Sequence, residues 1–513
     1  MKFSRVFSAQ PEYLEGAVIT VEVDISRGLH SFVIVGMASK AVDEARDRVS
    51  SALKNSHFSS PKSKNEKLVV SLVPADLKKE GSYHDVAIAL AYLLASEELS
   101  FEKEKKVFIG ELSLDGTVRP VLGILPIVQA AKKAGFEEIF VPFENREEAA
   151  LVDGICIYPV ETLTELVLHL DEKHELHKKI TPQSSSLPLL EKVPLVSTTD
   201  FVDIRGQLLA KRGLEIAAAG GHNICMFGPP GTGKTMLARA FCSILPPLKK
   251  EHLLEVITIH SVTGGMKPLE YMTEVPLRTP HHTASYVALI GGGTTPRPGE
   301  VSLAHRGVLF LDEFPEFDKR VIESLRQPLE DRVVDISRAK GSVRFPAHFI
   351  FVAAMNPCPC GFYGSSNGRC VCTASQIARY RSKISGPLID RIDLWVPVEH
   401  VEYRELTHND HQGESSHLLR QRVSDARDIQ FARSLKRYGK EFLNNELNAK
   451  NIQEEFFDEA TRNLLETSAK KMGLSPRAFH RVIKVARTIA DLEGAANIEQ
   501  NHILEALQYR PQQ

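Results

Sequence analysis

A short glycine-rich stretch carries the clearest chemistry in this sequence. Residues 228–235 read GPPGTGKT, with the spacing G-x-x-x-x-G-K-[ST] of a phosphate-binding loop. Glycines let such a loop approach a phosphate closely, so that backbone N–H groups can bind it. Lys234 would reach the β- and γ-phosphates of ATP, and Thr235 would hold Mg²⁺. The predicted nucleotide site comprises Gly228, Pro229, Pro230, Gly231, Thr232, Gly233, Lys234 and Thr235.

An acidic pair further along the chain could supply the rest of a hydrolytic site. GVLFLDEF at 307–314 leads through apolar residues to Asp312 and Glu313. Asp312 would complete the Mg²⁺ shell, and Glu313 would orient and polarise the attacking water. HFIFVAAMN at 348–356 ends at Asn356, whose side chain could contact the γ-phosphate or the water. The alternative is a pair of acids that are only solvated, and the loop upstream argues against it.

The sequence around the loop predicts the elements that must position it. ICMF at 224–227 predicts a short buried strand directly before the loop. TMLARAFCSIL at 235–245 predicts a helix directly after it. A loop between such a strand and helix directs the helix N-terminus at the phosphate, which is the context that the motif needs.

The chain is long enough for about three domains at roughly 100–200 residues each. Residues 1–170 alternate short apolar runs with helical patterns and predict a complete α/β domain. Residues 171–199 are rich in charge, Ser and Pro and predict a linker. Residues 200–398 predict a second α/β domain, and residues 399–513 a helical one. The expected fold class is therefore α/β with a C-terminal helical domain.

The overall composition excludes some functions. The chain is 43% hydrophobic and 25% charged with a net charge of −2, so any contact with nucleic acid must use a local patch. No apolar run approaches the ~18 residues of a membrane span. The first residues, MKFSRVFSAQPEY, lack the apolar core of a signal peptide. We expect a cytoplasmic protein with no membrane partner.

Four of the seven cysteines cluster in CPCGFYGSSNGRCVC at 358–372. In a reducing compartment this clustering favours a metal over disulfides, and four thiolates could close a tetrahedral Zn²⁺ site. The C-x-C spacing is tighter than the usual C-x₂₋₄-C, so reduced thiols in a loop are the alternative. The candidate zinc ligands are Cys358, Cys360, Cys370 and Cys372.

Three predicted strands together resemble those of an AAA+ P-loop ATPase. They are the strand before the phosphate-binding loop, the strand that leads to Asp312 and Glu313, and the strand that ends at Asn356. The resemblance implies a ring in which a neighbour supplies an arginine. SGPLIDRIDLWV at 385–396 resembles the segment with that arginine, which makes Arg391 the candidate finger; an ion pair with Asp390 or Asp393 is the structural alternative. DFVDIRGQ at 200–207 lies where such proteins hold the adenine.

The helical domain resembles an AAA+ lid. LSPRAFHR at 474–481 is similar to its second sensor, which implies that Arg477 contacts the γ-phosphate bound by the same chain. Arg481, one turn further along, is the competing candidate. The stretch at 417–440 is rich in Arg and Lys, and could be a solvated helix face or a set of phosphate contacts.

Two insertions resemble those of magnesium-chelatase-type AAA+ proteins. RTPHHTASYVALIGGGTTPRPGEVSLAH at 278–305 is similar to the helix-2 insert. VVDISRAKGSVRFPAHF at 333–349 predicts a hairpin with a basic tip, similar to the pre-sensor hairpin that projects into the pore of ring helicases. The candidate DNA contacts are Arg297, Arg338 and Lys340; an exposed polar turn is the alternative for the last two.

The N-terminal domain resembles the catalytic core of Lon-type proteases. KKEGSYHDVAIALA at 78–91 and FIGELSLDGTVRPVLGI at 108–124 carry this similarity. Lon proteases need a Ser nucleophile with a Lys base. The corresponding positions are Tyr83, beside Ser82, and the region of Leu125. We therefore expect a Lon-protease-like fold without peptidase activity.

Over nearly all of its length the chain resembles the ComM/YifB family of magnesium-chelatase-like proteins. This resemblance implies a homo-hexameric, ATP- and Mg²⁺-dependent motor on single-stranded or branched DNA. Its implied role is that of a helicase promoting branch migration during recombination of incoming DNA in natural transformation. The rival functions are a magnesium-chelatase-like ATPase and a protein-remodelling ATPase that does not act on DNA.

Overall fold

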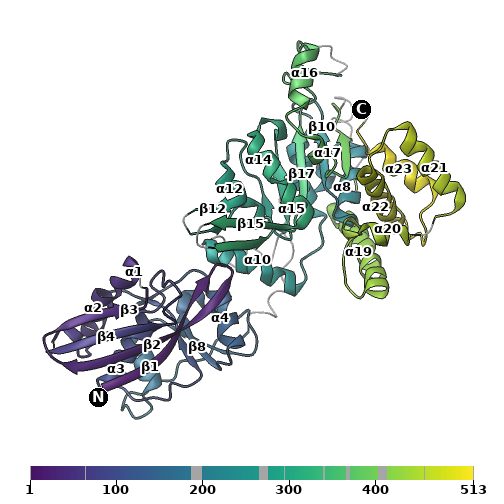
Figure 1. The fold of residues 1–513 in the computed structure, drawn as a ribbon. Coiled ribbons are helices and arrows are strands. Elements are labelled where there is room, and N and C mark those ends of the chain that lie inside the picture. Colours follow the sequence, from purple (N-terminus) through teal and green to yellow (C-terminus); the bar gives the residue numbers. More distant parts are fainter. Residues whose placement is uncertain are drawn as a thin grey trace. The chain divides into compact units, whose positions relative to one another are not determined.

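The computed structural model describes most of the chain and divides into two compact units. The described residues are 2–37, 39–63, 65–185, 199–264, 275–293, 295–338, 341–364, 370–401, 413–455 and 457–511. One unit comprises residues 1–193 and 254–272, and the other residues 194–253 and 273–513 (Figure 1). None of the helices within the described ranges combines the length and the apolar composition that a membrane crossing needs.

The first unit is built on a seven-stranded sheet with the order β3-β4-β2-β1-β5-β8-β9. β2 pairs antiparallel with both β1 and β4, whereas β5 runs parallel to β1. Along β2 the side chains alternate: Ile19, Val21 and Val23 are buried, and their neighbours are not. The strands are β1 (Lys2–Glu12), β2 (Glu15–Arg27), β3 (Ser31–Val35), β4 (Glu66–Val73), β5 (Lys106–Phe108), β8 (Glu138–Pro142) and β9 (Cys156–Val160).

Helices cover this sheet, and α3 (Asp85–Ala95) is buried on nearly every side because its sequence is apolar all round. The other elements are α1 (Lys40–Asp43), α2 (Ala45–Asn55), α4 (Ile124–Lys133), α5 (Arg146–Ala149), α6 (Leu163–Leu170), and the hairpin of β6 (Glu111–Leu112) and β7 (Val118–Arg119). Part of α10 (Lys250–Thr263) also packs here, since the Ser261 carbonyl accepts a hydrogen bond from the Gly123 N–H at 3.0 Å. No pattern in the sequence indicates that this segment joins the first unit.

The second unit has a five-stranded, all-parallel sheet with the order β11-β14-β17-β10-β18. Its strands are short and buried, as parallel strands between helices must be. They are β10 (Ile224–Phe227), β11 (Leu277–Arg278), β14 (Val308–Leu311), β17 (Ile350–Met355) and β18 (Leu394–Pro397). β10 comes first in the chain but lies between the last two strands, so the strand order reverses beside its carboxyl end, where ligands bind in such sheets.

Short helices and two small hairpins complete the nucleotide-binding part of this unit. The hairpins pair β12 (Gly291–Gly292) with β13 (Arg297–Pro298) and β15 (Val333–Arg338) with β16 (Gly341–Pro346). The helices are α8 (Leu208–Gly220), α9 (Lys234–Ser243), α12 (Tyr286–Ile290), α13 (Glu300–Leu303), α14 (Lys319–Ser324), α15 (Arg326–Asp331), α16 (Ala374–Arg381) and α17 (Gly386–Ile389).

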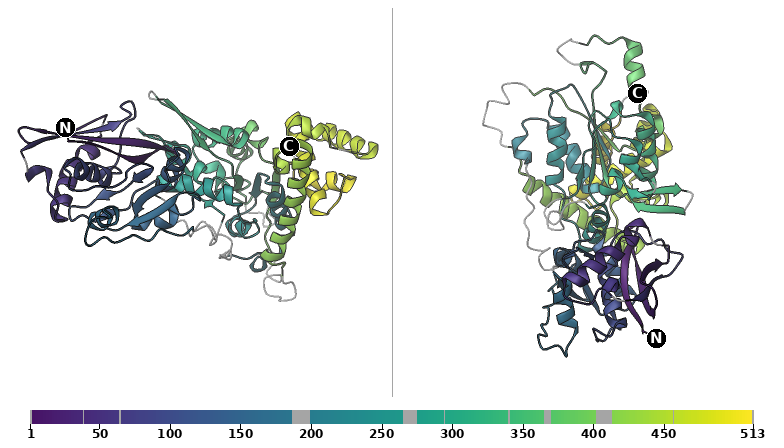
Figure 2. Two further views of the ribbon diagram at one scale, coloured as in Figure 1. Left: turned by 90° about the horizontal axis from the view of Figure 1, so that it is seen from below. Right: turned by 90° about the vertical axis from the view of Figure 1, so that its left-hand side faces the viewer.

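The C-terminal helices share one hydrophobic core with this sheet and do not form a separate compact unit. They are α19 (Ser416–Tyr438), α20 (Ala449–Gln453), α21 (Glu459–Lys471), α22 (Pro476–Leu492) and α23 (Gln500–Gln508). α19 and α22 pack against α8 (Figure 1 and Figure 2). Val423 and Ile489 from these helices join Leu214 and Ile224 in the shared core.

Arginines of α19 fix this packing. Arg420 donates to the Ser243 carbonyl at 2.8 Å, and Arg427 to the Ala218 carbonyl at 2.7 Å. Burial lowers the pKa of Arg427, which the low polarity around it explains. These two cations therefore serve the packing of the helices, which was neither of the two readings that the sequence offered for the 417–440 stretch.

Candidate nucleotide-binding and hydrolysis site

The phosphate-binding loop lies between β10 and α9 at the carboxyl edge of the parallel sheet. Gly231 and Gly233 have φ angles of 77° and 89°, in the left-handed region that favours glycine. An ideal Cβ on Gly228 would lie 2.0 Å from the Val398 carbonyl oxygen, so a side chain cannot fit there. Gly231 and Gly233 are therefore favoured by their backbone conformation, and Gly228 by the close approach of the Val398 carbonyl.

Lys234, the first residue of α9, lies largely buried inside this loop. Its Nζ donates hydrogen bonds to the carbonyl oxygens of Gly228 at 2.8 Å and Pro229 at 2.7 Å. The Oδ1 atom of Asn356, which directly follows β17, lies 3.4 Å away. Burial lowers the pKa of Lys234, and the Asp312 carboxylate opposes that shift. The Lys234 ammonium thus lies between the loop and the end of β17. Lys234 and Asn356, the two residues predicted to contact the γ-phosphate, are therefore adjacent.

Thr235 and Asp312 come together although 77 positions separate them in the chain. The Thr235 hydroxyl donates to Oδ2 of Asp312 at 2.6 Å, and the Glu313 N–H donates to Oδ1 at 2.9 Å. A hydroxyl and a carboxylate are the hard oxygen ligands that Mg²⁺ prefers. The donor set therefore fits the magnesium ion that accompanies ATP, with Thr235 and Asp312 as the residues that would hold it.

Glu313 has an unusual backbone and an unexpected partner. Its φ angle is 51°, in the left-handed region, and its half-exposed carboxylate pairs with His282, whose Nδ1 lies 3.2 Å from Oε2. The rings of His281 and His282 lie in contact, tilted by 33° with centroids 4.1 Å apart. His282 was not among the site residues predicted from the sequence. The available indication was the His pair that follows β11, because β11 lies next to the strand that ends at Asp312.

The segment expected at the adenine lies against the loop. Gln207, whose φ is 58°, donates from Nε2 to the Thr232 carbonyl at 3.4 Å and to the Glu399 carbonyl at 2.5 Å. Asp200 caps the short turn at 201–203 by accepting from the Val202 N–H at 3.0 Å. This segment therefore connects the loop to the end of the last strand of the sheet.

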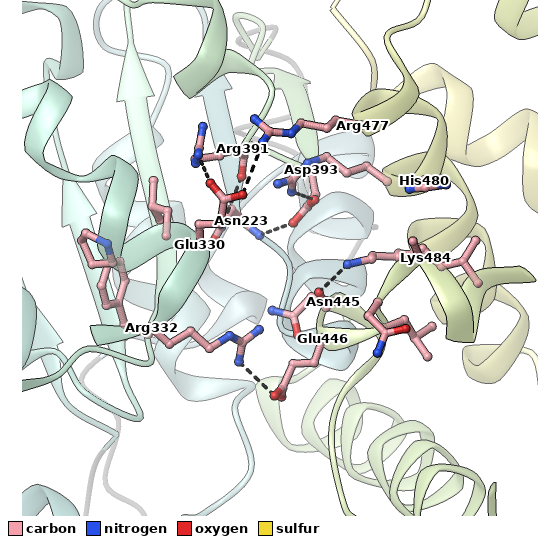
Figure 3. A pocket seen from close by; sticks show the side chains of 18 residues that line it. Asn223, Glu330, Arg332, Arg391, Asp393, Asn445, Glu446, Arg477, His480 and Lys484 are labelled. Carbon is pink, nitrogen blue, oxygen red and sulfur yellow. Dashed lines mark hydrogen bonds and ion pairs between the residues drawn. The ribbon is translucent and has the colours of Figure 1, made fainter. Parts of the chain in front are cut away.

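Arg391 and Arg477 lie together in the lining of one pocket (Figure 3). Both guanidinium groups pair with Glu330 of α15: Arg391 closely, and Arg477 at 3.4 Å from Nη2 to Oε1. They line a pocket of about 380 Å³ that also includes Asn223 and Asp393, the residues just before β10 and β18. The loop follows the opposite end of β10, about 13 Å away for four residues at roughly 3.3 Å each.

We expected Arg477 to reach the nucleotide bound by its own chain, but in the structure it lies at the edge of the sheet opposite the phosphate-binding loop. The physical reason lies in how α22 is anchored. Arg481, one turn after Arg477, forms an ion pair with buried Asp393, which holds the start of α22 at the far edge of the sheet. Asp393 was one of two carboxylates that could have paired with Arg391. In the structure it pairs with Arg481, and Arg391 pairs with Glu330.

This pocket is electropositive. Its lining carries five cations against three carboxylates: Arg332, Arg391, Arg477, Arg481 and Lys484 against Glu330, Asp393 and Glu446. Burial, together with the charges of Arg477 and Arg481, lowers the pKa of Arg391. A buried guanidinium among other cations is stabilised by an anion, and in this structure Glu330 provides that anion for Arg391.

Of the candidate DNA contacts, one has a described side chain and two do not. Arg297 is exposed on β13, in the segment between β11 and β14 that resembles the helix-2 insert. β15 and β16 form the expected hairpin, with Ser337 opposite Ser342. The Arg338 side chain and the whole of Lys340 lie outside the described residues, so the basic tip of this hairpin stays a prediction.

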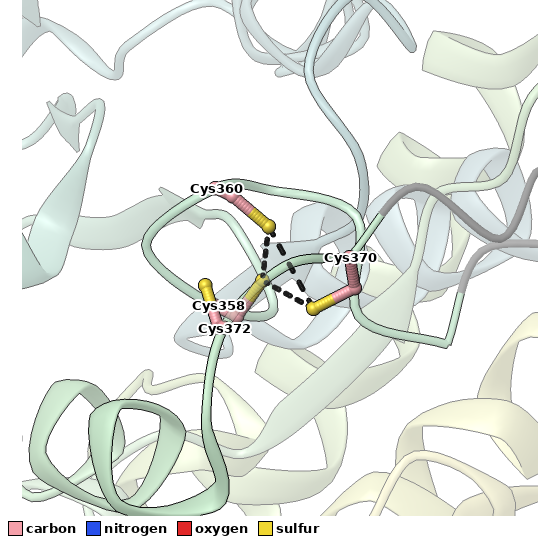
Figure 4. Close-up of side chains that lie close together, drawn as sticks. All are labelled: Cys358, Cys360, Cys370 and Cys372. Atoms are coloured by element: carbon pink, nitrogen blue, oxygen red, sulfur yellow. Dashed lines mark hydrogen bonds between the residues drawn. The ribbon is translucent and has the colours of Figure 1, made fainter.

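The four clustered cysteines bring their sulfur atoms together (Figure 4). All four Sγ atoms lie within 4.8 Å of one another. Backbone N–H groups of Phe362 and Val371 lower the pKa of the Cys360 thiol to about 6, because they stabilise a thiolate. The cluster could therefore hold a metal ion that prefers sulfur ligands.

In the first unit, the residues at the Lon-like positions do not form a Ser–Lys pair. Ser82 donates its hydroxyl hydrogen bond to Glu111, and Leu125 is buried in the apolar core. Lys132 and Lys133 are exposed in the last turn of α4. The described residues thus provide neither a nucleophile nor a base at these positions.

Comparisons with known proteins match this architecture. Family descriptions fit three segments: "Subunit ChlI of Mg-chelatase" at 21–145, "Magnesium chelatase, subunit ChlI" at 200–406 and "Magnesium chelatase, subunit ChlI C-terminal" at 413–510. The chain is 30% identical over 95 residues to Lon protease 2 of Bacillus subtilis, which covers 18% of this chain and 17% of that protein. The N-terminal unit is accordingly Lon-protease-like, and the second unit is an AAA+ domain with a helical lid.

Two relatives match over nearly the whole chain. The competence protein ComM of Haemophilus influenzae is 41% identical over 514 residues, which covers 99% of this chain and 98% of that protein. The protein YifB of Escherichia coli is 41% identical over 494 residues, which covers 96% and 94%. Because this similarity spans both units and accompanies the assembled phosphate-binding loop and acidic strand, the chain belongs to the ComM/YifB family of magnesium-chelatase-like AAA+ ATPases.

Proposed function

We propose that this protein is an ATP-driven ring motor that acts on DNA. Its role would be that of a helicase that promotes branch migration during recombination of incoming DNA in natural transformation. One observation supports the ring: the phosphate-binding loop and the two arginines lie at opposite edges of one sheet, so we propose that a second chain completes the hydrolytic site. The assignment to transformation rests on the near full-length similarity to the competence protein ComM.

Within one chain, the loop side of the site would bind ATP and activate water. Lys234 would contact the β- and γ-phosphates, while Thr235 and Asp312 would hold Mg²⁺. The ion, when bound, neutralises charge on the phosphate oxygens. Glu313 then orients the attacking water, once its carboxylate is released from His282.

A neighbouring chain would supply the cations that stabilise the transferred phosphoryl group. Arg391 and Arg477 are held together by Glu330, so both can approach the same phosphate across a subunit interface. An arginine supplied in this way is worth roughly 10³–10⁵ in rate. Head-to-tail contacts of this kind close into a ring, and we propose a homo-hexamer.

DNA would be held mainly through its phosphates. With a net charge of −2 the protein needs local cations, and the hairpin tip at Arg338 and Lys340 and the exposed Arg297 supply them. Phosphate contacts position a strand without reading its bases, which suits a motor on single-stranded or branched DNA. We also propose that Cys358, Cys360, Cys370 and Cys372 bind a structural Zn²⁺ ion.

Two measurements test the motor. Single-stranded or branched DNA should raise ATP turnover of the full chain, and the protein should unwind a branched DNA substrate in an ATP-dependent way. Glu313→Gln should abolish unwinding while ATP binding persists. If DNA leaves turnover unchanged and an unfolded protein substrate raises it, the protein is a remodelling ATPase. If neither has an effect, the chelatase-like alternative stands.

A further inference from the structure

The sulfur positions fit a tetrahedral metal site. The Sγ atom of Cys358 lies 3.4 Å from that of Cys360 and 3.8 Å from that of Cys370, and the last two are 3.7 Å apart. A tetrahedron with Zn–S bonds of about 2.3 Å has sulfur atoms about 3.8 Å apart. A disulfide would need about 2.05 Å, and all four thiols are free.

The backbone around the first two cysteines is shaped as a tight turn about the sulfur. The Tyr363 N–H donates to the Cys358 Sγ at 3.3 Å, and the Gly361 N–H to the Cys358 carbonyl at 3.0 Å. Gly361 has a φ of 84°, which favours glycine. Such N–H···S bonds orient a ligand before metal arrives, so this turn is built around its sulfur.

The same turn lies directly against the phosphate-binding loop. An ideal Cβ on Gly361 would lie 2.7 Å from Cδ and 3.2 Å from Cγ of Pro230, so Gly361 packs against the Pro230 ring with no room for a side chain. A second connection runs through Asn356, which lies two residues before Cys358 in the chain. The Oδ1 atom of Asn356 lies 3.4 Å from Nζ of Lys234. The cysteine site therefore adjoins the ATP site at two points.

We propose that metal bound by these four cysteines holds the phosphate-binding loop and Asn356 in place, so that zinc occupancy sets the affinity for ATP. The inference rests on the zinc binding proposed above. Without an ion, two C-x-C pairs in a Gly- and Ser-rich segment have no cross-link, and the turn that supports Pro230 loses its anchor. With the ion, the turn is a rigid support for the loop.

The first test removes the two ligands that are farther along the chain from Asn356 and Gly361. Full-length protein and the double variant Cys370→Ser/Cys372→Ser are purified without chelator, and zinc is measured by mass spectrometry. The original protein should hold about one zinc per chain and the variant less than ~0.3. The variant's Kd for a fluorescent ATP analogue should rise about tenfold, as expected for a displaced loop. Cys156→Ser, at an exposed cysteine in the first unit, is the control.

The second test uses matched glycines and keeps every ligand. Gly361→Ala should retain zinc but weaken ATP binding, because its methyl group would push on Pro230. Gly364→Ala has the same kind of backbone, with a φ of 75°, and among the described residues no atom lies within 4 Å of the added methyl, so both properties should persist. This pair remains decisive if the double variant does not fold.

The outcomes separate the two proposals. A zinc-free original protein would refute zinc binding itself. A zinc-free variant that binds ATP as tightly as the original protein would refute the coupling and leave zinc binding intact. Equal ATP affinity in Gly361→Ala and Gly364→Ala would also refute the coupling. Because the readouts are zinc content and ATP binding, they do not depend on whether DNA is the substrate.

Discussion

Nδ1 of His282 lies 3.2 Å from Oε2 of Glu313, so the carboxylate that we propose as the general base is paired with a side chain of the insert between β11 and β14. A carboxylate held by a histidine is less free to polarise water than one that faces the nucleotide. The insert also carries the exposed Arg297, a candidate DNA contact. If this insert contacts DNA, as we propose, the pair would connect DNA binding directly to hydrolysis.

We predict that His282→Ala raises ATP turnover in the absence of DNA. A partly exposed pair of this kind contributes about 1 kcal/mol, so the increase should be roughly fivefold. DNA should then stimulate the variant less than the original protein. Steady-state ATP hydrolysis with and without single-stranded DNA measures both effects. His281→Ala is the control, because Nδ1 of His281 pairs with Thr283. A fall in kcat for His282→Ala would mean that the histidine holds Glu313 in its working position.

We predict that mixing two inactive variants restores hydrolysis. Lys234→Ala disables the loop side of an interface, and Arg391→Ala disables the arginine side. If each site joins the loop of one chain to Arg391 of the next, equal random mixing leaves about a quarter of the interfaces intact, since half of the chains supply each side. Turnover of the mixture, compared with each variant alone, measures this.

The matching mixture of Lys234→Ala with Glu313→Gln is the control, because both residues belong to the loop side of one chain. It should stay inactive. Recovery in this control, or none in the mixture with Arg391→Ala, would argue that each chain completes its own site. Repeating the mixture with Arg477→Ala tests whether the second arginine acts across the same interface.

Local sequence was enough to predict the loop, its strand and helix, and the acidic strand, because these elements are contiguous and the strands are almost wholly apolar. The placement of Arg477 could not be predicted this way. It depends on where α22 packs, and that is fixed by the Arg481–Asp393 pair and by a core shared with residues more than two hundred positions away. His282 was missed for the same reason, since its proximity to Glu313 follows from the pairing of β11 with β14.

We predict that Arg297→Ala weakens DNA binding by removing one phosphate contact. The slope of log K against log salt concentration should then fall by about 0.7 for a single strand and about 0.9 for a duplex. ATP binding should be unchanged. Fluorescence anisotropy of labelled DNA at several salt concentrations measures the slope. Arg462→Ala, at an exposed arginine of α21, is the control. An unchanged slope for Arg297→Ala would exclude this residue as a contact.

We predict that Lys484 makes the stability of the second unit depend on pH above neutrality. Burial, together with the charges of Arg481 and Arg332 and against the attraction of Asp393, lowers the pKa of Lys484 from 10.5 to about 8. Its Nζ donates to the Asn445 carbonyl at 2.9 Å. Between these two pKa values the unfolded chain binds more protons, so the free energy of unfolding rises with pH across this window.

Lys484→Met removes this titration. The stability cost of the buried ammonium is fully present below pH 8 and is relieved as the pH rises toward 10.5. The variant should therefore be more stable than the original protein at pH 7. This difference in stability should shrink steadily between pH 8 and 10. Calorimetric melting of both proteins across this range measures it. A difference in melting temperature that does not change with pH would mean that Lys484 keeps its ordinary pKa in the folded protein.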